Sequence, residues 1–183
     1  YPGDVTALAL DGDGGLAFAL TSKHGGSYYK NKGTSTAPEL EKQTGNANPI
    51  DGIDGSSALG DLDGDGDVDL VTCTSDGSLI YSENTGTTTE PVFVQKTGTA
   101  NPFDGINVGS DSAPALGDLD GDGDLDLVGG EEDGSLIYLE NTGTSTAPVF
   151  VFLDFYGWGR GVGNPHVSCP KQNVPNGASA KWT

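Results

Sequence analysis

GDLDGDGDVDLV at residues 60–71 returns as GDLDGDGDLDLV at residues 117–128, so the chain carries two nearly identical acidic loops. In each loop aspartates alternate with other residues, and the glycines between them permit tight bends. A hard cation such as Ca2+ binds several oxygen ligands, which a short curled loop of this kind supplies. The two stretches therefore predict two calcium sites.

The spacing within each loop follows the start of a calcium-binding loop. Carboxylates occupy positions 1, 3, 5 and 9, glycine occupies position 6, and the aspartate at position 7 offers its backbone carbonyl. An alternating strand follows rather than a helix, so the ninth-position aspartate is expected to close the ligand shell in place of the Glu that ends an EF-hand loop. The predicted ligands are Asp61, Asp63, Asp65, Asp67 and Asp69 in one loop and Asp118, Asp120, Asp122, Asp124 and Asp126 in the other.

An upstream stretch, ALALDGDGGLAFAL at residues 7–20, occupies the same place in the pattern but lacks half of the carboxylates. Asp11 and Asp13 remain, whereas Ala9 and Ala17 replace the aspartates of positions 1 and 9. We expect calcium binding there to be weak or absent. For the two intact loops, the alternative is that acid-rich turns only keep the surface soluble, and the repeated registration disfavours it.

The similarity extends beyond the loops into repeats of about 52–57 residues, which fill most of residues 1–154. A fixed period of this size indicates an array of one supersecondary unit. Each unit has four strand-like pieces, which in the third unit lie at residues 112–118, 124–130, 134–140 and 148–152. We predict an all-β fold of about three β-propeller-type blades, each with four half-buried antiparallel strands. The predicted units are residues 1–57, 58–112 and 113–154.

Three blades are fewer than the roughly four to eight of a closed propeller, and an unclosed array leaves the apolar faces of its end blades open. Either the chain is part of a longer array, or copies of it associate and complete the propeller, or its tail caps one face. The tail, residues 155–183, is rich in glycine, has no acidic residue and matches none of the repeats. A further hypothesis is that the tail docks on an acidic blade of the same or an adjacent molecule.

The charge balance narrows the classes of partner. Eight basic residues against 27 acidic ones give a formal charge of −19, which repels nucleic acid and anionic lipid. No apolar run approaches the roughly 18 residues of a membrane span, so membrane insertion is not expected. The two histidines, His24 and His166, have no partner in a catalytic motif, and motifs for nucleophiles, phosphate or zinc are missing. We therefore expect no catalytic residues and no enzymatic activity.

The connections at residues 45–57 and 98–112 lie where the predicted blades meet. Ile50 and Phe103 stand beside an Asn-Pro turn in these connections. Loops of this kind commonly carry recognition, so each side chain either touches a ligand or forms an apolar plug between blades.

The two cysteines also leave alternatives open. Cys73 and Cys169 either form one disulfide that ties the tail to the repeats, or Cys73 is a small buried strand residue. The chain begins at Tyr1, which fits either a removed signal peptide or a fragment.

The two intact loops and the strands that follow them resemble the FG-GAP or VCBS repeats of integrin-type β-propellers. The family's calcium pattern, DxDxDGxxD, matches at residues 61–69 and 118–126, and the resemblance covers about residues 5–152. It implies calcium that rigidifies the blades and an extracellular or cell-surface role in adhesion or in recognition of a glycan or a protein. Two alternatives are a structural subunit of an extracellular filament or homo-oligomer, joined through open blade edges, and a non-catalytic accessory module of a larger secreted enzyme.

Overall fold

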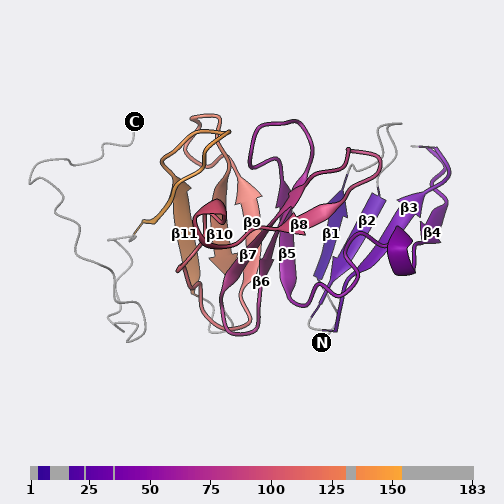
Figure 1. Ribbon diagram of the computed structural model, residues 1–183, viewed down its shortest axis with the longest axis horizontal. Helices are drawn as coiled ribbons and strands as arrows, with labels where there is room; N and C mark the ends of the chain where they lie inside the picture. The colour runs from indigo at the N-terminus through magenta and orange to yellow at the C-terminus, as the bar shows by residue number, and fades with distance from the viewer. Residues whose placement is uncertain (1–3, 9–16, 23, 35, 131–134, 154–183) are drawn as a thin grey trace, which may run out of the picture.

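The structure is a computed structural model, and it describes residues 4–8, 17–22, 24–34, 36–130 and 135–153. In these ranges the strands form three four-stranded antiparallel sheets, each in simple chain order, and there is no α-helix (Figure 1). The all-β fold predicted from the sequence is therefore confirmed. None of the described segments forms a helix long and apolar enough to cross a membrane.

Each sheet is called a blade below. Blade 1 contains β1 (Asp4–Leu8), β2 (Ala17–Thr21), β3 (Ser27–Asn31) and β4 (Leu40–Lys42). Blade 2 contains β5 (Ser56–Gly60), β6 (Asp69–Cys73), β7 (Leu79–Asn84) and β8 (Phe93–Gln95). Blade 3 contains β9 (Ala113–Gly117), β10 (Asp126–Gly130), β11 (Leu136–Asn141) and β12 (Phe150–Phe152). Two short 3-10 helices, η1 (Gly45–Ala47) and η2 (Gly98–Ala100), lie in the connections after blades 1 and 2.

The strands of blade 3 lie within the four pieces expected from the sequence, except that β11 extends one residue further, to Asn141. The second sheet begins at Ser56, close to the predicted border between units. The prediction of half-buried strands is wrong for β6, because all five of its residues, Asp69–Cys73, are buried. Blade 2 has a neighbouring blade on each side, so both faces of its inner strands are covered. The tail at residues 155–183 lies outside the described residues.

The blades are joined along their first strands. Strand β5 contacts both β1 and β9, so the first strands of the three blades lie side by side. Figure 1 shows the outer strands of blades 1 and 3 extending from this row in opposite directions. Hydrogen bonds add to the packing, since the amide of Ser57 in blade 2 donates to the buried Thr21 hydroxyl of blade 1 (3.0 Å). This fan of sheets is the arrangement of consecutive propeller blades.

The connections between blades contribute apolar plugs, so that reading of Ile50 and Phe103 is confirmed. Both side chains are almost completely buried, and the Phe103 ring stacks on Phe150 of blade 3 with 4.3 Å between ring centroids. An asparagine holds each plug in place. The Asn101 side chain accepts from the amide of Phe103 (3.1 Å) and donates to the Leu79 carbonyl (3.1 Å).

A second asparagine fixes the connection between the third and fourth strands of each blade. The Asn84 side-chain oxygen accepts hydrogen bonds from the amides of Gly86 (3.0 Å) and Val92 (2.9 Å). Asn31 and Asn141 make the equivalent pair of bonds in blades 1 and 3. The asparagine therefore ties the two ends of each connection together, and the connection in blade 3 lies against Gly64 in the acidic loop of blade 2.

Candidate metal centres

The loop between β5 and β6 is curled by hydrogen bonds to its own carboxylates. The two Asp61 carboxylate oxygens accept from the amides of Gly64 (2.8 Å) and Gly66 (3.0 Å). Both glycines have positive φ, +75° and +91°, a conformation that favours glycine over residues with a side chain. Asp63 accepts from the amide of Asp65 (3.2 Å), so successive carboxylates turn toward the inside of the loop.

This curl brings three predicted ligands of blade 2 together. Asp61, Asp63 and Asp65 each offer one carboxylate oxygen, and these oxygens all lie within 4.8 Å of one another. Two oxygens bound to one calcium ion at roughly 2.3–2.6 Å are at most about 5 Å apart. The spacing and the all-oxygen donor set therefore fit a calcium ion.

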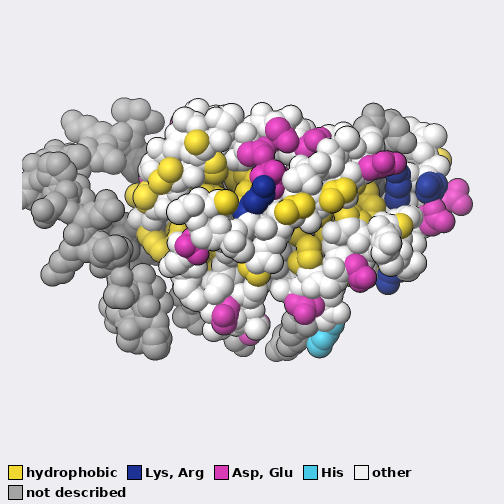
Figure 2. Space-filling model, viewed as in Figure 1, with side chains coloured by type: hydrophobic (Ala, Val, Ile, Leu, Met, Phe, Trp, Pro, Cys, Tyr) yellow, Lys and Arg dark blue, Asp and Glu magenta, His cyan; other side chains and the backbone are white. Residues whose placement is uncertain are grey.

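The loop between β9 and β10 in blade 3 repeats this geometry. Asp118, Asp120 and Asp122 form the second group of oxygens within 4.8 Å. Asp118 accepts from the amides of Gly121 (2.7 Å) and Gly123 (3.1 Å), as Asp61 does in blade 2. Both acidic loops lie along the upper edge of the molecule in Figure 1, and Figure 2 shows acidic side chains gathered there above blade 2. The degenerate loop with Asp11 and Asp13 lies outside the described residues.

The remaining predicted ligands lie outside these two groups. The position-7 residues, Asp67 and Asp124, follow the grouped aspartates in their loops. The Asp67 amide donates to the Asp65 carboxylate (2.8 Å), and the Asp124 amide donates to the Asp122 carboxylate (2.9 Å). Asp69 and Asp126 are buried at the starts of β6 and β10. Ligation stays a prediction for these four residues, as it does for the six of the two groups.

Asp69 is the centre of a buried hydrogen-bond network. One carboxylate oxygen accepts from the amide of Leu62 (3.0 Å) and from the Tyr81 hydroxyl (2.9 Å), and the other accepts from the amide of Asn84 (2.8 Å). The carboxylate thereby joins the loop, β6 and β7. A carboxylate has about four lone-pair positions, so one remains for an ion.

Blade 3 repeats this network with the same geometry. Asp126 accepts from the amides of Leu119 (3.0 Å) and Asn141 (2.9 Å) and from the Tyr138 hydroxyl (2.8 Å). In blade 1 the buried Ala17 stands where Asp69 and Asp126 stand, so the first blade lacks this carboxylate.

Sequence reasoning did not find the two tyrosines. Tyr81 and Tyr138 each lie twelve residues after the aspartate that they contact, within strands whose alternating pattern accounts for them as apolar positions. One signal could have revealed the pairing. Both intact units have an Asp and a Tyr at this separation, whereas the first unit lacks the Asp.

Burial and crowding set the electrostatics of these loops. Burial raises the pKa of Asp69, although hydrogen bonds from Asn84, Leu62 and Tyr81 act in the opposite direction. Burial also raises the pKa of Asp63; the amide of Asp65 lowers it, and the charges of nearby carboxylates, with Glu83 among them, raise it further. The pKa of Tyr81 is raised by burial and by the charge of Asp69, so this hydroxyl keeps its proton and donates.

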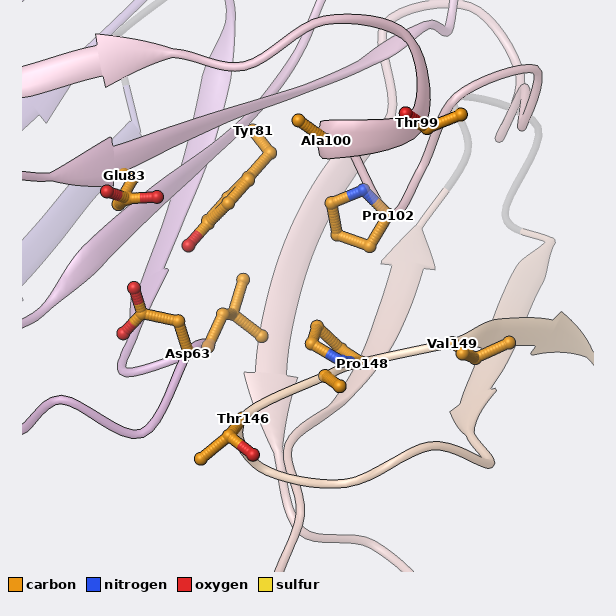
Figure 3. A pocket seen from close by; sticks show the side chains of 11 residues that line it. Asp63, Tyr81, Glu83, Thr99, Ala100, Pro102, Thr146, Pro148 and Val149 are labelled. Atoms are coloured by element: carbon orange, nitrogen blue, oxygen red, sulfur yellow. The ribbon is translucent and has the colours of Figure 1, made fainter.

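A pocket of about 330 Å³ adjoins the acidic loop of blade 2. Asp63 and Glu83 line one side of the pocket, and Pro102 and Pro148 line the opposite side (Figure 3). Tyr81 lies between the two carboxylates and Ala100. The Thr146 methyl lies so close to Gly64 that a Cβ added there would be 2.8 Å away. The pocket is therefore formed jointly by blade 2, the connection after it and blade 3.

The environment of Cys73 supports the reading of this residue as a buried strand residue. Cys73 is buried on β6 and has no disulfide partner among the described residues, and burial raises the pKa of its thiol to about 11. Cys169 lies outside the described residues, so the proposed disulfide stays a prediction.

We expect Cys73 in a Cys169→Ser variant to react with a thiol reagent at pH 8 at least roughly a hundredfold more slowly in the folded chain than in denaturant. The thiolate is the reactive form, and a rise in pKa from 9.0 to about 11 lowers its fraction about a hundredfold. Equal rates in both conditions would contradict the burial. In the wild-type chain, two reactive thiols after denaturation would argue against a Cys73–Cys169 disulfide.

Comparison with known proteins gives one family match. The family model of the FG-GAP-like repeat matches residues 61–129, which run from the first ligand of the blade 2 loop through the loop of blade 3 into β10. No curated protein and no solved structure matches the chain. Residues 61–129 are therefore similar to the FG-GAP-like repeat, which supports the family resemblance of the two intact units.

Proposed function

We propose that this chain is a non-catalytic, calcium-binding β-propeller module that works outside the cell in recognition of a glycan or a protein. The observation that carries the proposal is the pair of aspartate groups, Asp61, Asp63 and Asp65 and their counterparts in blade 3, which occupy equivalent loops. The family match supports the same reading, since it contains both loops.

The residues around each loop have separable roles in this proposal. Asp61 and Asp118 curl the loops, because both of their oxygens already accept backbone amides. Asp63 and Asp65 present further oxygens, and Asp69 links the loop to β7 through Tyr81. A bound calcium ion would supply positive charge that offsets the repulsion among these carboxylates.

The recognition role is supported by the pocket beside the blade 2 loop. Its wall of Pro102, Pro148 and Ala100 offers apolar surface, and Asp63 and Glu83 offer hydrogen-bond acceptors. Such a mixture of apolar surface and few directed polar groups is typical of ligand sites. A glycan array probed with and without calcium tests this part, and binding that requires calcium is the expected result. A structural role in an assembly is the second candidate, because the end blades have exposed apolar side chains.

The calcium proposal predicts two binding events per chain in isothermal titration calorimetry. Asp63→Asn and Asp120→Asn should each abolish or greatly weaken one event, and the double variant should lose both. Asparagine can keep the single hydrogen bond that each aspartate accepts from the amide two residues later, so the loss reports on the removed charge. Asp104→Asn, an exposed change outside the loops, is the matched control. Absence of calcium binding by the folded wild-type chain would contradict the proposal.

A further inference from the structure

One type of interface joins both pairs of consecutive blades. Each blade has a following face, which packs on the next blade, and a preceding face, which packs on the blade before. Blade 2 has Leu62 and Leu79 on its following face, in one buried cluster with the plug Phe103 and with Leu127 and Phe150 of blade 3. A second, equivalent cluster lies between blades 1 and 2. It contains Tyr28, Ile50 and Leu70, and Leu59, Val68 and Phe93 pack against it.

The following face of blade 3 carries the same side chains, and no described residue packs against them as blade 3 packs against blade 2. Leu119 occupies the position of Leu62 and is 56% exposed, whereas Leu62 is 2% exposed. Leu136 occupies the position of Leu79 and is 72% exposed, compared with 3%. Blade 3 therefore presents the surface that blade 2 uses to hold a further blade.

The backbone of blade 3 also has the space that a further blade needs. A Cβ added at Gly60 of blade 2 would meet the side chains of Leu116 and Leu125 in blade 3, and one added at the equivalent Gly117 would meet nothing within 4 Å. The loop glycines show the same contrast, since Gly64 lies against Thr146 and the equivalent Gly121 has no neighbour within that distance.

On the preceding face of blade 1, the described residue Leu40 is exposed in the complementary way. Leu40 occupies the position of Phe93 in blade 2 and Phe150 in blade 3, and it is 47% exposed, whereas Phe150 is 7% exposed. The two ends of the chain are therefore the two halves of the interface that occurs twice inside it.

We infer that a second copy of this chain covers both open faces, with blade 3 of each copy packed on blade 1 of the other. Two copies of three blades give a closed ring of six, inside the usual range of about four to eight, whereas three copies would give nine. A head-to-tail interface of this kind closes into a ring when the rotation per subunit permits it. The inference rests on the repeated interface and does not depend on the proposed calcium binding.

The test is the mass of the chain in solution, measured by size-exclusion chromatography with light scattering from low to high micromolar concentration. The wild-type chain is expected to have twice the 18.6 kDa of one copy, with calcium and with a chelator. Leu136→Asp and Leu40→Asp should each give the mass of a single copy while retaining the wild-type β-sheet circular dichroism, because both side chains are exposed in one copy. Val92→Asp should stay dimeric, since Val92 is exposed in blade 2 although that blade is covered on both faces.

Mixing the two disruptive variants tests the head-to-tail arrangement. A Leu40→Asp copy keeps an intact blade 3, a Leu136→Asp copy keeps an intact blade 1, and together they should recover a 1:1 dimer that neither forms alone. A wild-type chain that has the mass of a single copy at all concentrations would overturn the inference. A Leu40→Asp variant that remains fully dimeric would also overturn it, because that result would indicate that blade 3 pairs with blade 3. Either failure leaves the calorimetric test of calcium binding unaffected.

Discussion

Removal of calcium by a chelator is expected to lower the midpoint of thermal unfolding by about 10–20 °C. A ligand present at a hundred times its dissociation constant stabilises the folded state by about 2.7 kcal/mol per site, and the chain has two equivalent loops. For a chain of this length, 1 kcal/mol corresponds to roughly 2–4 °C. The unfolded chain lacks the curl that brings Asp61, Asp63 and Asp65 together, so binding favours the folded state. Circular dichroism melts with excess calcium and with excess chelator measure this shift.

The variant with both Asp63→Asn and Asp120→Asn provides the matched comparison. Its melting midpoint should not respond to calcium, because each loop has lost a ligand charge. Its midpoint in chelator should equal or exceed that of the chelated wild-type chain, because one like charge has been removed from each crowded loop. A wild-type midpoint that is the same with calcium and with chelator would contradict the stabilising role.

Replacement of Asp69 by alanine is expected to lower the free energy of unfolding by about 3–5 kcal/mol, even in chelator. The change leaves the Tyr81 hydroxyl and the amides of Leu62 and Asn84 without their acceptor in a buried place. An unsatisfied buried polar group costs about 1–3 kcal/mol, and three groups lose one partner here. Urea unfolding, followed by far-ultraviolet circular dichroism of the backbone, gives the free energy of unfolding.

Two further variants separate the network from simpler explanations. Tyr81→Phe removes one of the three donors and leaves the carboxylate with the other two, so its effect should be only about 1 kcal/mol. Asp104→Ala, which removes an exposed carboxylate, should change stability by less than about 0.5 kcal/mol. If Asp69→Ala were destabilising with calcium but neutral in chelator, Asp69 would act only as a metal ligand, and the structural network would be refuted.

Much of the fold could be predicted because the sequence repeats its local signals. Each intact acidic loop is followed by an alternating strand, an Asp-Gly turn, a second alternating strand and an Asn-Thr-Gly connection. The predicted strand pieces of blade 3 therefore overlap β9 to β12 closely. The burial of β6 on both faces could not be predicted, because it depends on how blades 1 and 3 flank blade 2. Strand alternation describes one sheet and carries no information on the covering of its two faces.

The candidate metal centres were predicted in part for a similar reason. Asp61, Asp63 and Asp65 are close in sequence and in a tight loop, so their spacing alone brings their oxygens together. Asp69 belongs to the same acidic pattern, but its hydrogen-bond partners Tyr81 and Asn84 lie on the next strand. The pocket was not predicted either, because Asp63 and Pro148 meet only after blades 2 and 3 pack.

The most direct measurement of the calcium claim is a crystal structure of the chain grown with calcium, with anomalous scattering recorded to identify the ion. The account predicts two anomalous peaks per chain, one within about 2.6 Å of the Asp61, Asp63 and Asp65 carboxylates and one equally close to Asp118, Asp120 and Asp122. Loops without a peak in calcium-saturated crystals, or with these carboxylates turned toward solvent, would contradict it.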